Sequence, residues 1–338
     1  MARSFAPAGY APFDEGPFRV STRSFEAVDA ERDLVFPCTM WHPADVAGSP
    51  AGNRSPLVVF SHASGAGRNS ATYLTSHLAS HGYVVAALDH SELVAAKLAP
   101  APGESAEERV ARILAIIASR VPDVRLLLDT LLNGERGSLA AGAAGDAAGI
   151  DLDPDRVGLV GHSFGGWTVL AVPEVDARVR AVVALGPGGS SRPLPGILAL
   201  TLTFEWGRDV PTLYLAAEDD VPIPLDAVTE LMSRTRASRR MFVLRHADHQ
   251  HFMDDVEAEH EALRAMSLPG DAAWIPGAMR PIAELCSGEH AHVFVRGLTL
   301  AHLDATLRQS GGASEFLDGD VVADLAARGV AAFTPARC

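Results

Sequence analysis

The length, composition and charge of the chain exclude several classes of protein. It has 338 residues, 48% of them hydrophobic and 21% charged, which is enough apolar material for a sizeable folded core. Its formal net charge of −14 repels nucleic acid and anionic membrane surfaces, so neither is expected as a partner. The sequence shows no signal-like apolar run at the N-terminus and no stretch of about 18 apolar residues, so a cytoplasmic location is expected.

The three cysteines predict neither a disulfide framework nor a zinc site, because they are few and far apart. Cys38 lies in a strand-like stretch and is interpreted as a small core residue. A bridge between Cys286 and Cys338 would tie down the C-terminal tail, and the sequence leaves that pairing open.

The predicted elements alternate between strands and helices along the chain. Residues 18–43 read as two antiparallel strands joined by the turn Asp29–Asp33. The later strands are expected at 57–60, 83–88, 156–160, 179–185, 211–216 and 240–244, with helices at about 70–81 and 107–133. Pro122 predicts that the second of these is two helices or one kinked helix. The Ala/Gly-rich residues 138–149 are interpreted as a flexible surface loop.

This alternation predicts an α/β fold with a mostly parallel, doubly wound sheet flanked by helices. No repeat or domain boundary is visible, so residues 1–338 are expected to form a single domain. Residues 253–289 interrupt the alternation and contain several prolines and Trp274, and they are interpreted as an insertion near the functional site.

The strongest chemical signal is the segment Gly161-His162-Ser163-Phe164-Gly165-Gly166. A Gly-x-Ser-x-Gly match by itself is weak, because chance supplies on the order of 0.1–0.2 matches per chain of this composition. Here a strand, 157–160, precedes the motif and an apolar helix follows it, as a nucleophilic serine on a strand-to-helix turn requires. Ser163 is therefore predicted to be a nucleophile.

A serine hydroxyl needs a general base, and the base needs an orienting acid. The acid should follow a late strand, where Glu218-Asp219-Asp220 offers Asp220 first and Asp219 second. The base should follow the next strand, where His249 is the first choice and His251 the second.

The same histidine-rich stretch has to be weighed as a metal site. His246, Asp248, His249 and His251 are all ligand types. Their spacing matches no motif of fixed geometry, and no second cluster completes a shell, so neither a metal nor another cofactor is expected.

An acyl-transfer site also needs donors for the oxyanion of the tetrahedral intermediate. The backbone N–H of Phe164, directly after the nucleophile, is one candidate. The other is expected in the Gly-containing loop after strand 57–60, with the N–H of Ser64 preferred over that of Ala63.

These motifs resemble the dienelactone-hydrolase-like branch of the α/β-hydrolases, close to the platelet-activating-factor acetylhydrolases and bacterial cutinases. The resemblance covers roughly residues 19–252 and a helix near 292–308, and it includes Phe60-Ser61-His62-Ala63-Ser64-Gly65, Ser76–Val85 and Asp123–Asp129. It implies Ser163 as nucleophile, His249 as base, and Phe164 and Ser64 as oxyanion donors.

The sequence departs from this branch at three points. Gly186-Pro187-Gly188-Gly189 stands where the acetylhydrolases carry their acid, so Asp220 matches the cutinase arrangement instead. Ala63 stands where the family usually has glycine. The dienelactone hydrolases themselves use cysteine, so their substrate is not transferred.

The function expected from the sequence is hydrolysis of a small-molecule carboxylic ester through an acyl-enzyme. Trp167 and Trp206 are candidates for lining the substrate pocket, although core packing explains aromatic residues equally well. Acyl transfer with the same triad, and a binding protein that has lost its chemistry, remain alternatives. The sequence leaves substrate identity and oligomeric state open.

Overall fold

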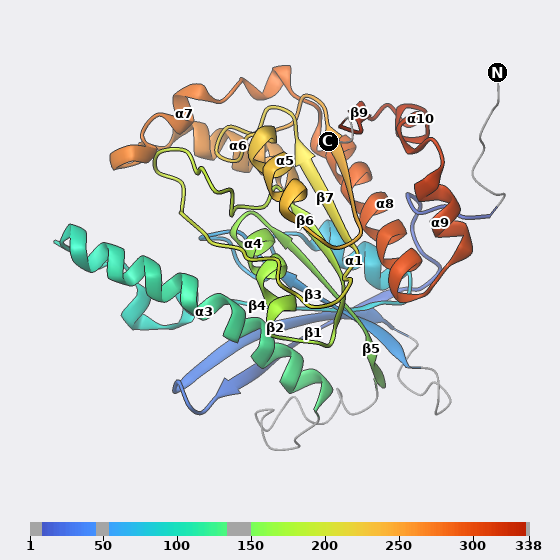
Figure 1. The fold of residues 1–338 in the computed structure, drawn as a ribbon, viewed down its shortest axis with the longest axis horizontal. Helices are drawn as coiled ribbons and strands as arrows, with labels where there is room; N and C mark the ends of the chain where they lie inside the picture. Colours follow the sequence, from blue (N-terminus) through green and yellow to red (C-terminus); the bar gives the residue numbers. More distant parts are fainter. Residues whose placement is uncertain (1–8, 45–53, 134–149, 336–338) are drawn as a thin grey trace.

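The computed structural model describes residues 9–44, 54–133 and 150–335, which are built around one nine-stranded sheet (Figure 1). The strand order is β1-β2-β4-β3-β5-β6-β7-β8-β9. The strands are β1 (Val20–Asp29), β2 (Leu34–Pro43), β3 (Ser55–Ser61), β4 (Val84–Leu88), β5 (Leu152–His162), β6 (Val179–Leu185), β7 (Thr212–Ala217), β8 (Arg239–Leu244) and β9 (Ala332–Phe333).

The sheet is parallel from β4 through β8, as predicted. Among the strands that the structure describes, the antiparallel pairs are β1–β2, β2–β4 and β8–β9. Strand β9 is two residues long and was not predicted, because so short a segment carries no period of its own.

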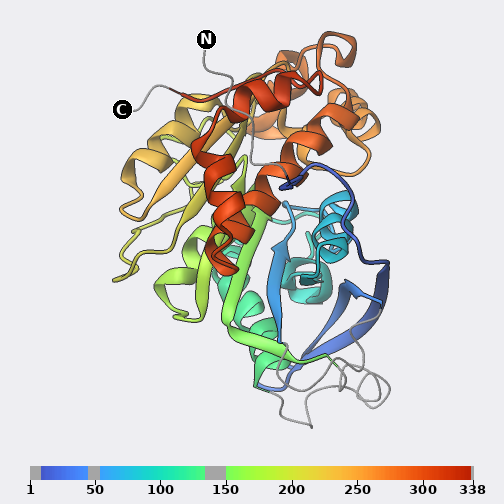
Figure 2. The same cartoon turned by 90° about the vertical axis from the view of Figure 1, so that its right-hand side faces the viewer.

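Each central strand sends alternate side chains to opposite faces of the sheet, and helices cover both faces (Figure 2). Val58 and Phe60 of β3 pack on the side of α1 (Thr72–Ser80) and α8 (Gly288–Leu307). Leu57 and Val59 face the opposite core, with α3 (Ala106–Leu132), α4 (Phe164–Ala171) and α5 (Leu225–Arg234). Burial on both faces explains why these strands read as continuous apolar runs.

Residues 106–132 form one helix, α3, with Pro122 inside it, so the alternative of two separate helices is wrong. A side-chain and backbone capping box between Ser105 and Glu108 starts the helix. Residues 120, 123, 124, 127 and 128 are buried, and this spacing defines the face that packs on the sheet.

The segment 253–289 contains α6 (Val256–Ala265), α7 (Ile275–Ala278) and short 3₁₀ turns before α8 begins. Its side chains contact the loops that follow β7 and β8: His260 bonds to Asp248, and Arg280 pairs with Asp219. Helices α9 (Gly311–Asp318) and α10 (Val321–Ala326) follow α8 and precede β9. None of the described helices is long and apolar enough to cross a membrane.

Of the three cysteines, Cys38 is buried in β2, as expected, and Cys286 is partly buried. Cys338 and the predicted loop 138–149 lie outside the described residues.

Candidate active site

The nucleophile turn lies between β5, which ends at His162, and α4, which begins at Phe164. Ser163 has φ 58° and ψ −114°, a conformation that L side chains rarely adopt. The turn depends on glycine: a Cβ at Gly161 would lie 2.3 Å from the Gly165 carbonyl oxygen, and one at Gly165 only 1.9 Å from that of Ser61. The turn therefore requires glycine at positions 161 and 165, because no side chain fits at either of them.

The structure brings the three predicted triad residues into one hydrogen-bonded chain. The His249 Nε2 atom is 2.8 Å from Ser163 Oγ, and its Nδ1 atom is 2.7 Å from Asp220 Oδ2. The other carboxylate oxygen of Asp220 accepts the backbone N–H of Ile223 at 2.8 Å. These three side chains come from loops after β5, β7 and β8, which end at the same edge of the parallel sheet.

The neighbouring carboxylates have other partners. Asp219 Oδ1 accepts from Arg280 at 3.1 Å, and Glu218 pairs with Arg245 at 2.7 Å. Only Asp220 of the three contacts His249.

The second candidate base, His251, is turned away from the nucleophile. Its Nδ1 atom is 2.8 Å from Asp248 Oδ1, and its Nε2 atom is 3.0 Å from the Cys286 carbonyl oxygen. The Nδ1 atom of the buried His260 lies 2.5 Å from the other carboxylate oxygen of Asp248, and its Nε2 atom lies 3.0 Å from the Arg280 carbonyl oxygen. Asp248 and these two histidines thus fasten the segment 253–289 to the loop that carries His249.

The four residues weighed as a metal site do not converge on one point, because Asp248 and His251 bond to each other while His249 belongs to the triad. A different group, Glu218, Asp219 and His246, places ligand-type atoms within 4.8 Å of one another. The ion pairs of Glu218 with Arg245 and of Asp219 with Arg280 reduce the negative charge of that group.

His251 is expected to make the stability of the protein depend on pH in the alkaline range. Burial lowers its pKa, but the Asp248 carboxylate and the Cys286 side chain outweigh burial and raise it to about 10. A raised folded-state pKa stabilises the fold fully below the unfolded value of about 6.5, and that contribution is lost as pH rises towards about 10.

The variant His251→Gln should therefore lower the free energy of unfolding by about 3 kcal/mol at pH 6 and by clearly less at pH 9.5. Urea unfolding of both proteins at several pH values measures this. A difference that stays the same across the range would contradict the assignment of a charged His251.

Burial raises the pKa of the Asp220 carboxyl, and the positive His249 and the Ile223 N–H oppose that rise. For His249, burial alone lowers the pKa, but the charge and hydrogen bond of Asp220 outweigh it, so the pKa lies above its ordinary value of about 6.5. A histidine that accepts a proton from serine must be neutral.

The acidic limb of the kcat/KM profile is therefore expected to have its midpoint above about pH 6.5, with activity lost as one proton binds below it. Hydrolysis of a p-nitrophenyl ester between pH 5 and 9 measures this midpoint. A midpoint below pH 6 would show that Asp220 does not raise the basicity of His249.

The two predicted oxyanion donors belong to segments that pack against each other. Phe164 is the first residue of α4, so its N–H has no acceptor within the helix. Ser64 lies in the exposed loop after β3, and the chain just before it lies against the start of α4, where a Cβ at Gly165 would collide with the carbonyl oxygens of Ser61 and His62.

A cavity of about 400 Å³ lies beside the nucleophile turn, lined by residues 187–194, 197–198 and 222–224 and by Asp226, Ala227 and Glu230. Two lining residues touch the triad: the Gly188 N–H donates to the Ser163 carbonyl oxygen at 3.1 Å, and Ile223 donates to Asp220.

The two tryptophans predicted to line the pocket are not among these lining residues. Trp167 stacks on Phe164 and donates to the Thr201 carbonyl oxygen, and Trp206 packs against Phe204. Both are less than 8% exposed.

Two buried side chains that the sequence did not predict contact the site. His162 is buried with its ring 4.7 Å from that of His249, and Arg120 is completely buried beneath Phe164. The sequence signal for Arg120 was its place on the apolar face of the helix, at 113, 116, 117, 120, 124 and 127.

Comparison with known families and proteins finds similarity to one group of hydrolases. Residues 40–116 match the model of the family described as platelet-activating factor acetylhydrolase, isoform II. The chain is 31% identical over 159 residues to a platelet-activating factor acetylhydrolase of Cavia porcellus, covering 40% of this chain and 36% of that protein. The corresponding protein of Canis lupus familiaris is 28% identical over 156 residues, with 35% of its length covered. The matched part is thus about a third of each relative.

The solved structures include a ferulic acid esterase from Streptomyces cinnamoneus that resembles this chain in fold. The TM-score is 0.58 at 23% identity, over 87% of this chain and 91% of the other. The fold is therefore the α/β-hydrolase fold, as the sequence predicted.

Proposed function

We propose that this chain is a serine carboxylic ester hydrolase that works through Ser163, His249 and Asp220 and forms an acyl-enzyme. The observation that supports it most is the unbroken hydrogen-bonded chain from Ser163 Oγ through both ring nitrogens of His249 to a buried carboxylate. The similarity to proteins named acetylhydrolases points to the same class of chemistry.

In the first half of the reaction, Ser163 Oγ attacks the carbonyl carbon of the ester while His249 Nε2 takes the hydroxyl proton. The electron pair of the carbonyl π bond moves to oxygen, and the N–H groups of Phe164 and Ser64 donate to the oxyanion. The intermediate then collapses: the ester C–O bond breaks, and His249 returns the proton to the departing alcohol.

In the second half, water replaces the alcohol. His249 removes a proton from the water as it attacks the acyl-enzyme, and the Ser163 Oγ leaves with that proton when the acid is released. Asp220 stays ionised and holds Nδ1–H of His249, so that Nε2 is the nitrogen that accepts and returns the proton.

The cavity beside Ser163 is the proposed binding space for part of the substrate. Its volume of about 400 Å³ is at the lower end of the roughly 300–1,000 Å³ of ligand pockets, which favours a small ester group. Pro187, Ile223 and Leu194 offer apolar surface to an acyl chain. A small-molecule ester is therefore the proposed substrate, and Trp167, which lies next to the lining residue Gly189, would support this pocket from behind. We retain a cytoplasmic location as a prediction.

The test is hydrolysis of p-nitrophenyl esters of increasing acyl length, together with labelling by a fluorophosphonate probe. We expect release of p-nitrophenol with an optimum at short chains, and one label per protein on the peptide that contains Ser163. A folded protein that stays unlabelled and inactive on every ester would contradict the proposal. If added alcohols receive most of the acyl group in place of water, the protein is an acyltransferase using the same residues.

A further inference from the structure

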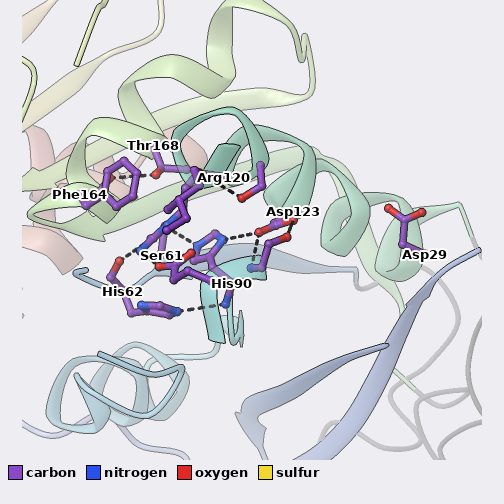
Figure 3. Close-up of polar contacts among 12 residues, drawn as sticks. Asp29, Ser61, His62, His90, Arg120, Asp123, Phe164 and Thr168 are labelled. Carbon is purple, nitrogen blue, oxygen red and sulfur yellow. Dashed lines mark hydrogen bonds and ion pairs between the residues drawn. The ribbon is translucent and has the colours of Figure 1, made fainter. Parts of the chain in front are cut away.

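The loop proposed to donate to the oxyanion rests on a completely buried arginine (Figure 3). Arg120, in the middle of α3, donates from Nη1 to the His62 carbonyl oxygen at 2.7 Å, and its Nη2 lies 3.5 Å from that of Ala63. Nη2 also pairs with the Glu92 carboxylate. Burial of a guanidinium destabilises the fold unless the charge is paired and hydrogen-bonded. The contacts with Glu92 and with the loop carbonyl oxygens offset that penalty here.

The buried imidazole of His62 also forms hydrogen bonds that fix the same loop. The backbone N–H of His90 donates to His62 Nε2 at 3.1 Å, so the ring proton is on Nδ1. That Nδ1–H donates to the Ala63 carbonyl oxygen at 2.7 Å. The Ala66 N–H also donates to this oxygen, at 3.2 Å.

Holding a carbonyl oxygen also fixes the direction of an N–H. In a trans peptide group the C=O of one residue and the N–H of the next lie in one plane and point in opposite directions. The Ala63 carbonyl faces the His62 ring and the Arg120 guanidinium, so the Ser64 N–H points away from both.

The same guanidinium contacts the second proposed donor residue. Its Cζ atom lies 4.2 Å from the centroid of the Phe164 ring, a cation–π contact between two buried side chains. Figure 3 shows Arg120 between Phe164 and the segment Ser61–His62. One side chain therefore touches both segments whose N–H groups are proposed to bind the oxyanion.

Helix α3 supports this arrangement a second time, one turn beyond Arg120. The buried Asp123 accepts from His90 Nδ1 at 3.1 Å and from the N–H and hydroxyl of Ser91, both at 2.8 Å. His90 Nε2 in turn accepts a hydrogen bond from the Ser61 hydroxyl at 2.8 Å. The loop after β4, which holds His62 in its tautomer, is thus itself anchored to α3.

We propose that Arg120 is a positioning residue of the oxyanion site, which holds the peptide groups of the 62–64 loop and the ring of Phe164 in the orientation that presents the Ser64 and Phe164 N–H groups to the oxyanion. His62 serves the same loop through the Ala63 carbonyl. This inference rests on the proposed ester hydrolysis.

The test compares Arg120→Met and Arg120→Lys with wild type and with Arg208→Met. Arg208 is a matched control, because it also donates to backbone carbonyl oxygens, those of Pro173 and Asp176, but away from the triad. The substrates are a p-nitrophenyl ester and its thiono analogue, in which sulfur replaces the carbonyl oxygen and uses the oxyanion donors poorly.

In Arg120→Met we expect kcat to fall about 100-fold, the loss typical of one misplaced oxyanion donor, with KM within about threefold of wild type. The ester-to-thionoester rate ratio should fall about tenfold, because the substrate oxygen loses its advantage. The acidic limb of the pH profile should not move, because it reports on His249. Arg120→Lys should lose about tenfold in kcat, since an ammonium lacks the planar fork. Arg208→Met should keep the wild-type kcat and ratio.

The inference is overturned if folded Arg120→Met or Arg120→Lys keeps kcat within about threefold of wild type, or loses kcat with an unchanged ester-to-thionoester ratio. Thermal unfolding identifies a variant that does not fold. If Arg120→Met does not fold, the kcat and the ester-to-thionoester ratio of Arg120→Lys test the inference. An inactive wild type would overturn the proposed hydrolysis and this inference together, whereas an active wild type with unimpaired Arg120 variants would overturn the inference alone.

Discussion

Replacing Ser163 with alanine is expected to lower kcat for ester hydrolysis by about 10⁵–10⁶-fold, the loss seen when a triad nucleophile is removed. Alanine removes the hydroxyl oxygen that His249 Nε2 contacts at 2.8 Å, so no acyl-enzyme forms. Steady-state rates with a short p-nitrophenyl ester, and absence of the fluorophosphonate label, measure the effect.

The fold should survive this change, because alanine adds no atom to the turn and tolerates the backbone angles about as well as serine does. A suitable control is Ser233→Ala on α5, whose hydroxyl bonds only to a carbonyl within its own helix. Retention of more than about one hundredth of the wild-type kcat in Ser163→Ala would place the nucleophile elsewhere.

Replacing Asp220 with asparagine should lower kcat by about 10⁴-fold, while Asp219→Asn should change it by less than about threefold. Asparagine at position 220 can still bond to His249, but its NH₂ group faces Nδ1 and favours the wrong tautomer. It also leaves the imidazolium formed during the reaction without a counter-charge in a buried site.

Asp219→Asn weakens only an ion pair with Arg280, which is 40% exposed at its side chain. The two variants differ by one position and remove the same charge, so each is the control for the other. Rates with the same ester decide between them. If Asp219→Asn is the inactive variant, the acid of the triad has been assigned to the wrong residue.

Much of the fold could be predicted from the sequence because it rests on local patterns. The apolar runs of β3, β4 and β6 have the length and composition of strands buried on both faces. The prediction failed where a pattern was too short, as at β9, and it left two alternatives open at Pro122, of which the structure has the single helix. There α3 continues through the proline because the helix packs against the sheet on either side of it.

The supporting residues of the site could not be predicted in the same way. Arg120 interrupts an apolar helix face and pairs with Glu92, 28 residues earlier, across a contact that only folding creates. His260 meets Asp248 across twelve residues, and no local pattern distinguishes it from an ordinary polar residue of an exposed helix. Buried polar residues whose partners are distant in sequence therefore could not be predicted from local patterns.

The nucleophile turn is the part of the site that the sequence by itself determined. Its two glycines, the preceding strand and the following helix are adjacent in sequence and together predict the strand-to-helix turn at Ser163, although the carbonyl oxygens that exclude a side chain at Gly165 belong to the distant Ser61 and His62. Which of several histidines contacts that serine, and which of three carboxylates contacts that histidine, was decided only by the tertiary structure. Asp220 and His249 lie 57 and 86 residues from Ser163, and the order of parallel strands brings their loops to one edge of the sheet.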